Sequence, residues 1–130
     1  MSYTISTTVD DDFDSVVESA IAALEDEGFG VLCDVDVQAT FEKKLDVEYD
    51  RYRILGACNP SLAHQGLEEE PDLGALLPCN VTVYERDDGT VAVSAVDPAV
   101  LVAVTENPEL DAIGEEVHER FQRVVDSLRE

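Results

Sequence analysis

The segment at residues 79–96, CNVTVYERDDGTVAVSAV, constrains the fold of this chain more than any other part of the sequence. Apolar and polar residues alternate on both sides of an Asp-Asp-Gly sequence, which is typical of two strands joined by a tight turn. Val81 and Val83 share one face of the first strand, and Val91 and Val93 share one face of the second. Strands with one apolar face indicate a sheet that is covered on one side, so we expect a mostly antiparallel sheet.

Strands and helices alternate through the rest of the chain. Period-two alternation predicts strands, and apolar residues spaced by three or four predict helices. The expected strands lie at residues 3–9, 30–38 and 51–58, and the expected helices at residues 13–27, 38–47, 61–70 and 108–128. With the hairpin, the order is β-α-β-(α)-β-α-β-β-α. We therefore predict one domain over residues 1–130 with a two-layer α+β fold, in which helices pack on one face of a mostly antiparallel sheet.

Residues that begin and end helices stand at the expected boundaries. Asn59 and Asn107 are suitable N-caps, and each is followed by a proline, Pro60 or Pro108, which suits the first helical position. Gly28 follows the first apolar helical pattern and is suited to a left-handed helix end. These residues support the expected helices independently of the apolar pattern.

Charge is the second strong constraint. The chain has 30 acidic residues against 8 Lys and Arg, which gives a formal charge of −22 at pH 7. The acids recur along the chain on polar positions, a pattern that resembles the halophilic proteins of salt-accumulating archaea. We interpret this acidic surface as an adaptation to salt. The alternative is a surface that attracts a basic partner or mimics nucleic acid.

The same charge and composition argue against several classes of partner. No basic stripe is present to neutralise phosphates, so we do not expect nucleic acid as a partner. No apolar run approaches the roughly 18 residues of a membrane span, and the N-terminus does not resemble a signal peptide. We expect a cytoplasmic protein without membrane association. Its three cysteines lack CxxC spacing and are expected to be free thiols.

Two cysteine-containing segments carry a family resemblance. They are RILGACNPSLAHQGL at residues 53–67 and LLPCN at residues 76–80. Their sequences and their separation resemble the core motif of the domain-of-unknown-function family 302. The resemblance extends over nearly the whole chain and implies a small two-layer domain that tends to form homodimers. The family has no assigned biochemical role, so the resemblance implies a fold and no reaction.

Cys58 and Cys79 are the main candidates for a chemical site. Cys58 ends one expected strand and Cys79 begins the next, so antiparallel pairing would place both at the same edge of the sheet. Two thiolates and a third ligand suit a soft metal such as Zn²⁺ or Cu⁺, and Asn59 and His64 are candidates for that ligand. The alternatives are a redox pair and two small buried core residues.

Other polar residues near these segments form a second group of candidates. Lys43 and Lys44 are the only lysines of the chain, which indicates a local need such as an ion pair or an anion site. Glu85 continues the apolar face of its strand, so we expect it to point inward and to pair with one of these lysines or with Arg53. Cys33 stands at an apolar position in the middle of a strand, and we expect it in the core.

Three functions are compatible with these residues. We favour a binding module, in which a small dimeric domain binds a metal or small ligand around Cys58, Asn59 and Cys79. One alternative is a structural or protein-interaction domain whose cysteines only pack. The other is a thiol-dependent enzyme or redox protein, with His64 as a base for Cys58. We consider an enzyme less favoured, because the chain has no GxSxG, HExxH or glycine-rich phosphate loop.

The charge of −22 predicts that stability depends on salt. At molar salt the Debye length is about 3 Å, so the repulsion among carboxylates is largely screened. We expect the melting temperature to rise by roughly 10 °C between about 0.1 M and 2 M KCl, measured by circular dichroism. A melting temperature that is independent of salt would contradict the halophilic interpretation.

Overall fold

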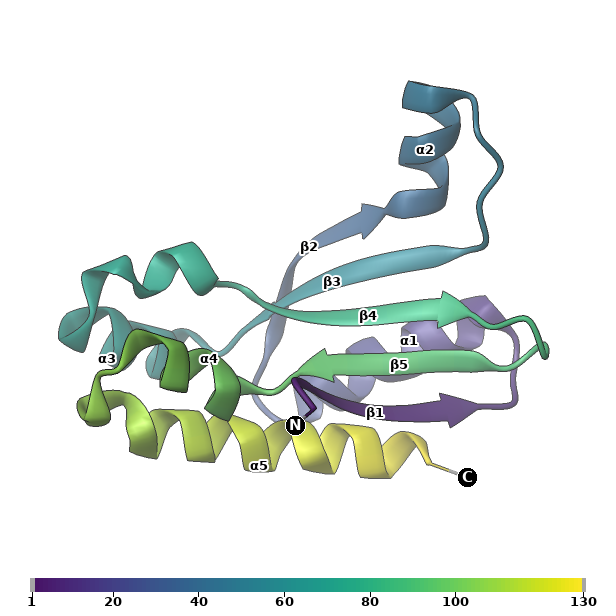
Figure 1. The fold of residues 1–130 in the computed structure, drawn as a ribbon. Helices are drawn as coiled ribbons and strands as arrows, with labels where there is room; N and C mark the ends of the chain where they lie inside the picture. Colours follow the sequence, from purple (N-terminus) through teal and green to yellow (C-terminus); the bar gives the residue numbers. More distant parts are fainter. Residues whose placement is uncertain (1, 130) are drawn as a thin grey trace.

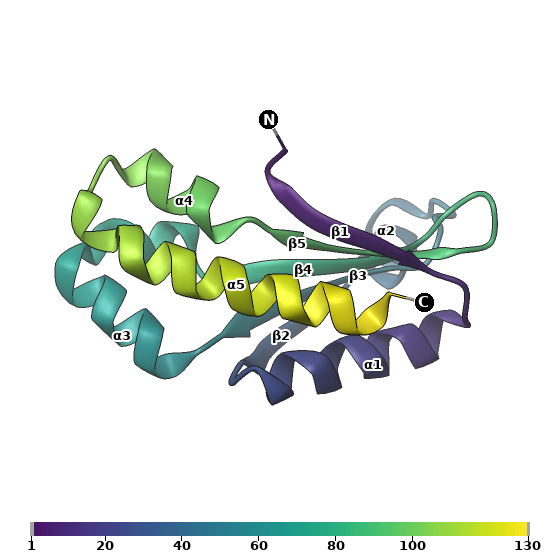
Figure 2. The ribbon, with the colours of Figure 1, turned by 90° about the horizontal axis from the view of Figure 1, so that it is seen from below.

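The computed structural model describes residues 2–129, in which a sheet and a layer of helices pack face to face (Figures 1 and 2). The strands are β1 (Thr4–Val9), β2 (Gly30–Asp36), β3 (Tyr52–Cys58), β4 (Cys79–Glu85) and β5 (Val91–Val96). The α-helices are α1 (Phe13–Asp26), α2 (Val37–Leu45), α3 (Pro60–Glu69), α4 (Pro98–Thr105) and α5 (Asp111–Leu128), and the 3-10 helices are η1 (Pro71–Leu76) and η2 (Pro108–Leu110). The predicted α+β fold is confirmed.

All strand pairs of the sheet are antiparallel. The order across the sheet is β1-β5-β4-β3-β2, so β1 and β2 are the edges and β4 is central. Helices α1 and α5 lie side by side on one face (Figure 2). In the part of the chain that the structure describes, the opposite face of the sheet carries no such helix layer, as the one-sided alternation of the strands predicts.

The main core lies between this sheet and helices α1 and α5. Phe121 of α5 is fully buried, and its ring centroid lies 4.8 Å from that of Phe29. Val81 and Val83 of the central strand β4 are also fully buried against the helix layer. Full burial of a Val or Phe side chain stabilises a protein by roughly 1.5–3 kcal/mol, so this layer contact dominates the fold.

The local signals for turns and caps are confirmed. Asp12 caps α1 by accepting a hydrogen bond from the backbone N–H of Ser15. Gly28 follows α1 with φ +86°, a left-handed conformation that glycine adopts without steric cost. Gly89, with φ +87°, forms part of the turn between β4 and β5. Local sequence and tertiary structure therefore agree at both ends of the first helix and at the turn of the predicted hairpin.

The prediction that Cys33 is a core residue is wrong, because Cys33 is exposed. In the register of β2 with β3, Val31 pairs with Ala57 but Cys33 pairs with Gly56. Leu32 is therefore the extra residue of a β-bulge, which interrupts the alternation of inward and outward side chains. Cys33 consequently lies on the open face of the sheet, with its sulfur directly over Gly56.

Residues 35–51 form an arm that extends beyond the two layers (Figure 1). The arm contains helix α2, in which no residue is buried. Its side chains include Leu45, Val47 and Tyr49, which are 64%, 47% and 45% exposed. A helix of nine residues with no buried side chain has little tertiary stabilisation.

The short helices form a second, smaller core at the end of the sheet near α3 and α4. Its buried residues are Leu73, Val102 and Leu110. Asn107 and Pro108 open η2 here, whereas we expected them to open the final helix directly; α5 begins at Asp111. Such 3-10 turns are frequent at the start of α-helices. Within residues 2–129, none of the helices has the length and apolar character needed to cross a membrane.

The burial pattern predicts a large difference between two identical substitutions. Val83→Ala removes two buried methyl groups from the central strand and should lower the free energy of unfolding by about 2 kcal/mol. Val104→Ala removes the same groups from a side chain that is 65% exposed, and it should change the free energy of unfolding by less than about 0.5 kcal/mol. Urea unfolding at fixed salt measures both values. Equal losses for the two variants would contradict the described packing.

Candidate functional site

A cavity of about 70 Å³ lies between the end of the sheet and the short helices. Ala57, Cys58 and Cys79 form its sheet side, and Asn59 stands where β3 passes into α3. The remaining lining residues are apolar or lack a side chain and come from the helices and their connections: Phe29, Leu62, Ala63, Leu73, Leu77, Pro98, Leu101, Val102, Ile113, Gly114 and Val117. The cavity is therefore enclosed mainly by hydrocarbon.

The pairing of β3 with β4 brings Cys58 and Cys79 to this cavity. Ala57 pairs with Cys79, so the last residues of β3 lie beside the first residues of β4. This register confirms that the end of β3 and the start of β4 lie side by side at one end of the sheet. Both thiols are free, and both residues are partly buried. Their role at the cavity stays a prediction.

Burial is the main influence on the Cys79 thiol. Desolvation disfavours the thiolate and, with a smaller contribution from the nearby Cys58, raises the pKa of Cys79 from 9.0 to about 11. Cys79 is therefore a neutral thiol at pH 7. A nucleophilic or metal-binding cysteine needs the thiolate, so either role would have to overcome this desolvation.

Asn59 has both a structural role and a place on the cavity wall. Its Oδ1 accepts a hydrogen bond of 3.1 Å from the backbone N–H of Leu62, which makes Asn59 the predicted N-cap of α3. Its Nδ2 faces Gly28, where a Cβ atom would stand only 3.0 Å away. Asn59 is thus fixed in position by the helix start, and its amide is the strongest hydrogen-bonding group among the lining residues.

His64 is not among the residues that line the cavity. Its side chain is 77% exposed, and its Nε2 lies 3.2 Å from a carboxylate oxygen of Glu68 one helical turn away. The helix that Asn59 caps therefore turns His64 outward. The structure brings Cys58, Asn59 and Cys79 together and leaves His64 apart from them.

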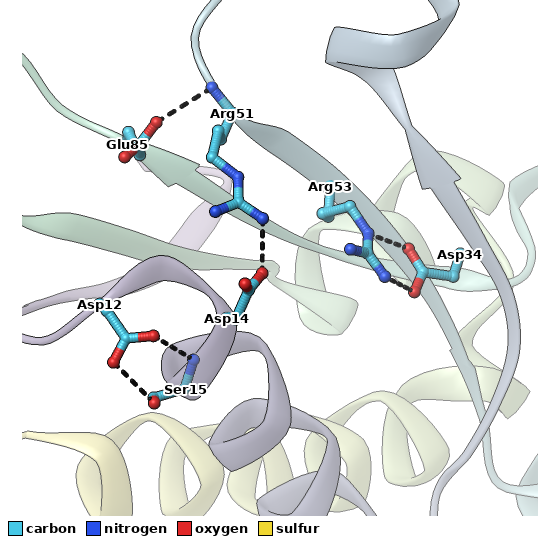
Figure 3. Close-up of polar contacts among 7 residues, drawn as sticks. All are labelled: Asp12, Asp14, Ser15, Asp34, Arg51, Arg53 and Glu85. Atoms are coloured by element: carbon cyan, nitrogen blue, oxygen red, sulfur yellow. Dashed lines mark hydrogen bonds and ion pairs between the residues drawn. The ribbon is translucent and has the colours of Figure 1, made fainter.

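The charged candidates lie away from the cavity and pair differently from the prediction. Glu85 is exposed, so the expectation that it points inward is wrong; its carboxylate accepts a hydrogen bond from the backbone N–H of Arg51 (Figure 3). Glu85 is the last residue of β4, and its cross-strand partner Val91 is the one of this pair that is buried in the core. Within residues 2–129, Lys43 and Lys44 make no ion pair; they end α2, where cations complement the helix dipole.

Arg53 pairs with a residue that sequence reasoning did not consider. Its guanidinium donates two hydrogen bonds to the Asp34 carboxylate across β2 and β3, and the Nε–Oδ1 distance is 2.6 Å (Figure 3). The hydrogen bond to Asp34 raises the pKa of Arg53. Arg51 similarly bonds the Asp14 carboxylate of α1 at 2.5 Å. These pairs join the sheet edge and α1 and do not form an anion site.

The donor set around the cysteines limits which metal the cavity would accept. In the part of the chain that the structure describes, no group of three or more His, Cys, Asp or Glu residues is placed to hold a metal ion. Structural zinc sites use four protein ligands, so two sulfur atoms alone do not make such a site.

Sequence reasoning did not identify the helical wall of the cavity. Helix α4, which lies outside the helices expected from the sequence, supplies Pro98, Leu101 and Val102 to the lining. Gly114 of α5 permits this approach, since a Cβ atom there would lie 2.8 Å from a methyl carbon of Val102. The Val and Leu residues of α4 indicate from the sequence that the segment is partly buried. They do not indicate which surface it packs against.

The chain is similar to proteins of a family whose description names no function. The model of the family described as "Domain of unknown function DUF302" matches residues 5–128. The crystal structure of an uncharacterized conserved DUF302 protein from Bacillus stearothermophilus is 28% identical, with 99% of this chain and 100% of that chain covered and a TM-score of 0.92. No curated protein is significantly similar. Since the family model covers nearly the whole length, the chain belongs to the DUF302 family.

Proposed function

We propose that this domain is a binding module that takes a small, uncharged and largely apolar ligand into the cavity beside Cys58 and Cys79. The observation that carries the proposal is the lining itself, in which hydrocarbon encloses about 70 Å³ and Asn59 provides one amide. Binding pockets commonly combine apolar walls with a few placed polar groups. Among residues 2–129, no Asp, Glu, Lys or Arg lines this cavity, so a charged ligand would lose its hydration without an ion-pair partner.

The size of the cavity limits the ligand. A cavity of about 150 Å³ binds benzene, so 70 Å³ accommodates only a few non-hydrogen atoms. The ligand is therefore a very small molecule or the short apolar end of a larger one. The neutral Cys79 thiol can orient the ligand through a weak hydrogen bond, and the Asn59 amide through a stronger one.

Cu⁺ is a second candidate, favoured by the proximity of the two thiols. Cys58 contributes to the raised pKa of Cys79, so their sulfur atoms interact electrostatically. Metal binding would require loss of the thiol proton, which makes the affinity rise with pH. A thiol-dependent enzyme is less well supported, because the pKa of Cys79 is raised and His64 lies outside the cavity.

Binding at the cavity can be tested with n-butanol as an apolar probe, followed by amide NMR shifts in molar KCl. We expect shifts confined to the lining, with a dissociation constant in the millimolar range. Ala63→Leu fills the cavity from α3 and should weaken binding at least about tenfold. Ala99→Leu makes the same change at an exposed position of α4 and should leave binding unchanged.

The same samples distinguish the metal from the apolar ligand. Under reducing conditions, Cu⁺ that binds at the cavity should be lost in Cys58→Ser and Cys79→Ser and retained in the control Cys33→Ser, whose thiol is exposed elsewhere. Butanol shifts that persist in Ala63→Leu would contradict the apolar proposal. Cu⁺ binding that does not distinguish the three cysteines would contradict the metal candidate.

The raised pKa of Cys79 predicts a specific loss of stability at alkaline pH. Above pH 9 the unfolded chain loses the thiol proton while the folded protein retains it, so unfolding becomes more favourable up to about pH 11. Relative to Cys79→Ala, the native protein should lose on the order of 2 kcal/mol of unfolding free energy over this interval. Urea unfolding of both proteins at several pH values measures the difference. Parallel pH profiles would show that Cys79 is not desolvated.

A further inference from the structure

The end of α1, the start of α3 and the middle of α5 meet at Gly28, beside the apolar cavity (Figure 2). Two side-chain nitrogen atoms converge on this glycine. A Cβ atom built on Gly28 would lie 3.0 Å from Nδ2 of Asn59 and 3.0 Å from Nη1 of Arg120. Both groups are hydrogen-bond donors, so neither satisfies the other. An acceptor atom that reaches this place would find two donors close together.

The amide of Asn59 presents its donor, and not its acceptor, to a ligand. Oδ1 is already used, because it accepts the hydrogen bond from the backbone N–H of Leu62 that caps α3. A flip of the amide would remove this cap, so the orientation of Nδ2 is fixed by the start of the helix. Asn59 therefore offers the cavity a preoriented N–H group.

This N–H group has no partner within the protein. Among residues 2–129, Nδ2 of Asn59 donates no hydrogen bond to a protein atom, and no fully buried side-chain nitrogen or oxygen lacks a partner. Nδ2 is consequently open to the cavity or to solvent. A ligand that enters the cavity and covers Nδ2 has to supply an acceptor, since a buried donor without a partner is unfavourable.

The charges around Gly28 favour a neutral acceptor over an anion. The Nη1 group of Arg120 donates a 2.7 Å hydrogen bond to the backbone carbonyl of Glu27, and its Nε lies 3.3 Å from a carboxylate oxygen of Glu116. Helix α1 ends beside Gly28, and a helix carries negative partial charge at its C-terminus. The guanidinium charge is thus already compensated, and an anionic ligand would face Glu116.

We propose that the ligand of the cavity is a short-chain aldehyde or ketone, whose carbonyl oxygen accepts a hydrogen bond from Nδ2 of Asn59 and whose alkyl end occupies the apolar space. This inference rests on the proposed apolar binding function and adds the chemical group at its polar end. A carbonyl oxygen accepts hydrogen bonds without donating, so it matches a position that offers donors only. An alcohol at the same place would leave its own hydroxyl proton without an acceptor.

Two probes of equal size, 2-butanone and n-butanol, test the carbonyl group by amide NMR titration in molar KCl. In the native protein the dissociation constant of 2-butanone should be at least about fivefold lower than that of n-butanol. Asn59→Asp retains an oxygen for the cap of α3 and removes the donor. This variant should bind 2-butanone at least about tenfold more weakly and should prefer n-butanol, whose hydroxyl proton the carboxylate accepts. Asn80→Asp makes the same change at an exposed position of β4 and is the matched control.

A measurement on the native protein keeps the test independent of the folding of Asn59→Asp. The side-chain NH₂ resonances of Asn59 should move downfield with 2-butanone, and those of Asn80 should not. An unchanged preference in folded Asn59→Asp, an Asn59 resonance that does not respond, or butyrate that binds more tightly than 2-butanone would overturn the carbonyl assignment while n-butanol still binds the apolar cavity. If neither n-butanol nor 2-butanone shifts the lining residues, the proposed apolar function is overturned together with this inference.

Discussion

The antiparallel pairing of β3 with β4 is the interaction on which the rest of the molecule depends. It places Val81 and Val83 against α1 and α5, and it sets Ala57 opposite Cys79 at the cavity. A shift of one residue would turn the buried valines to the open face and change the position of Cys79 relative to Cys58 and the cavity. The core and the candidate site therefore depend on the same set of backbone hydrogen bonds.

The molecule has two uncharged regions, which differ in the kind of side chain they contain and lie on different sides of the sheet. The cavity is enclosed by helices at the end of the sheet and is lined by hydrocarbon, with Asn59 and the neutral thiol of Cys79 as its polar features. The face of the sheet opposite α1 and α5 is the second region, and it carries hydroxyl and aromatic side chains such as Thr82, Tyr84 and Ser94. Acidic residues occupy much of the remaining surface, so these two regions are where an uncharged molecule meets no opposing charge.

Local and periodic signals predicted most of the architecture. The hairpin, the Asp12 and Asn59 caps and the apolar stripe of the last helix were predictable, because each depends on residues close in sequence. The position of Cys33 was not, because one bulged residue at Leu32 reverses the alternation without a clear sequence signal. An inward Glu85 was wrong for a different reason: period two gives the face of a strand, not the burial of the residue at its end.

The candidate site was predictable only in part. Antiparallel order was sufficient to bring Cys58 and Cys79 to one edge, and the Asn-Pro sequence was sufficient to place Asn59 at a helix start. The apolar wall could not be derived, because it depends on how α4 packs on α5 through Gly114 and Val102. Tertiary contacts between segments far apart in sequence thus decide whether two cysteines border solvent, a metal or a cavity.

The central claim is that the space beside Cys79 is a preformed apolar site, and crystals pressurised with xenon test it most directly. Xenon binds in dry apolar cavities without requiring hydrogen bonds or charge. We predict anomalous density between Cys79 and the helical wall formed by Leu62 and Val102. Xenon bound elsewhere in the molecule, with this space filled by side chains or ordered water, would contradict the account.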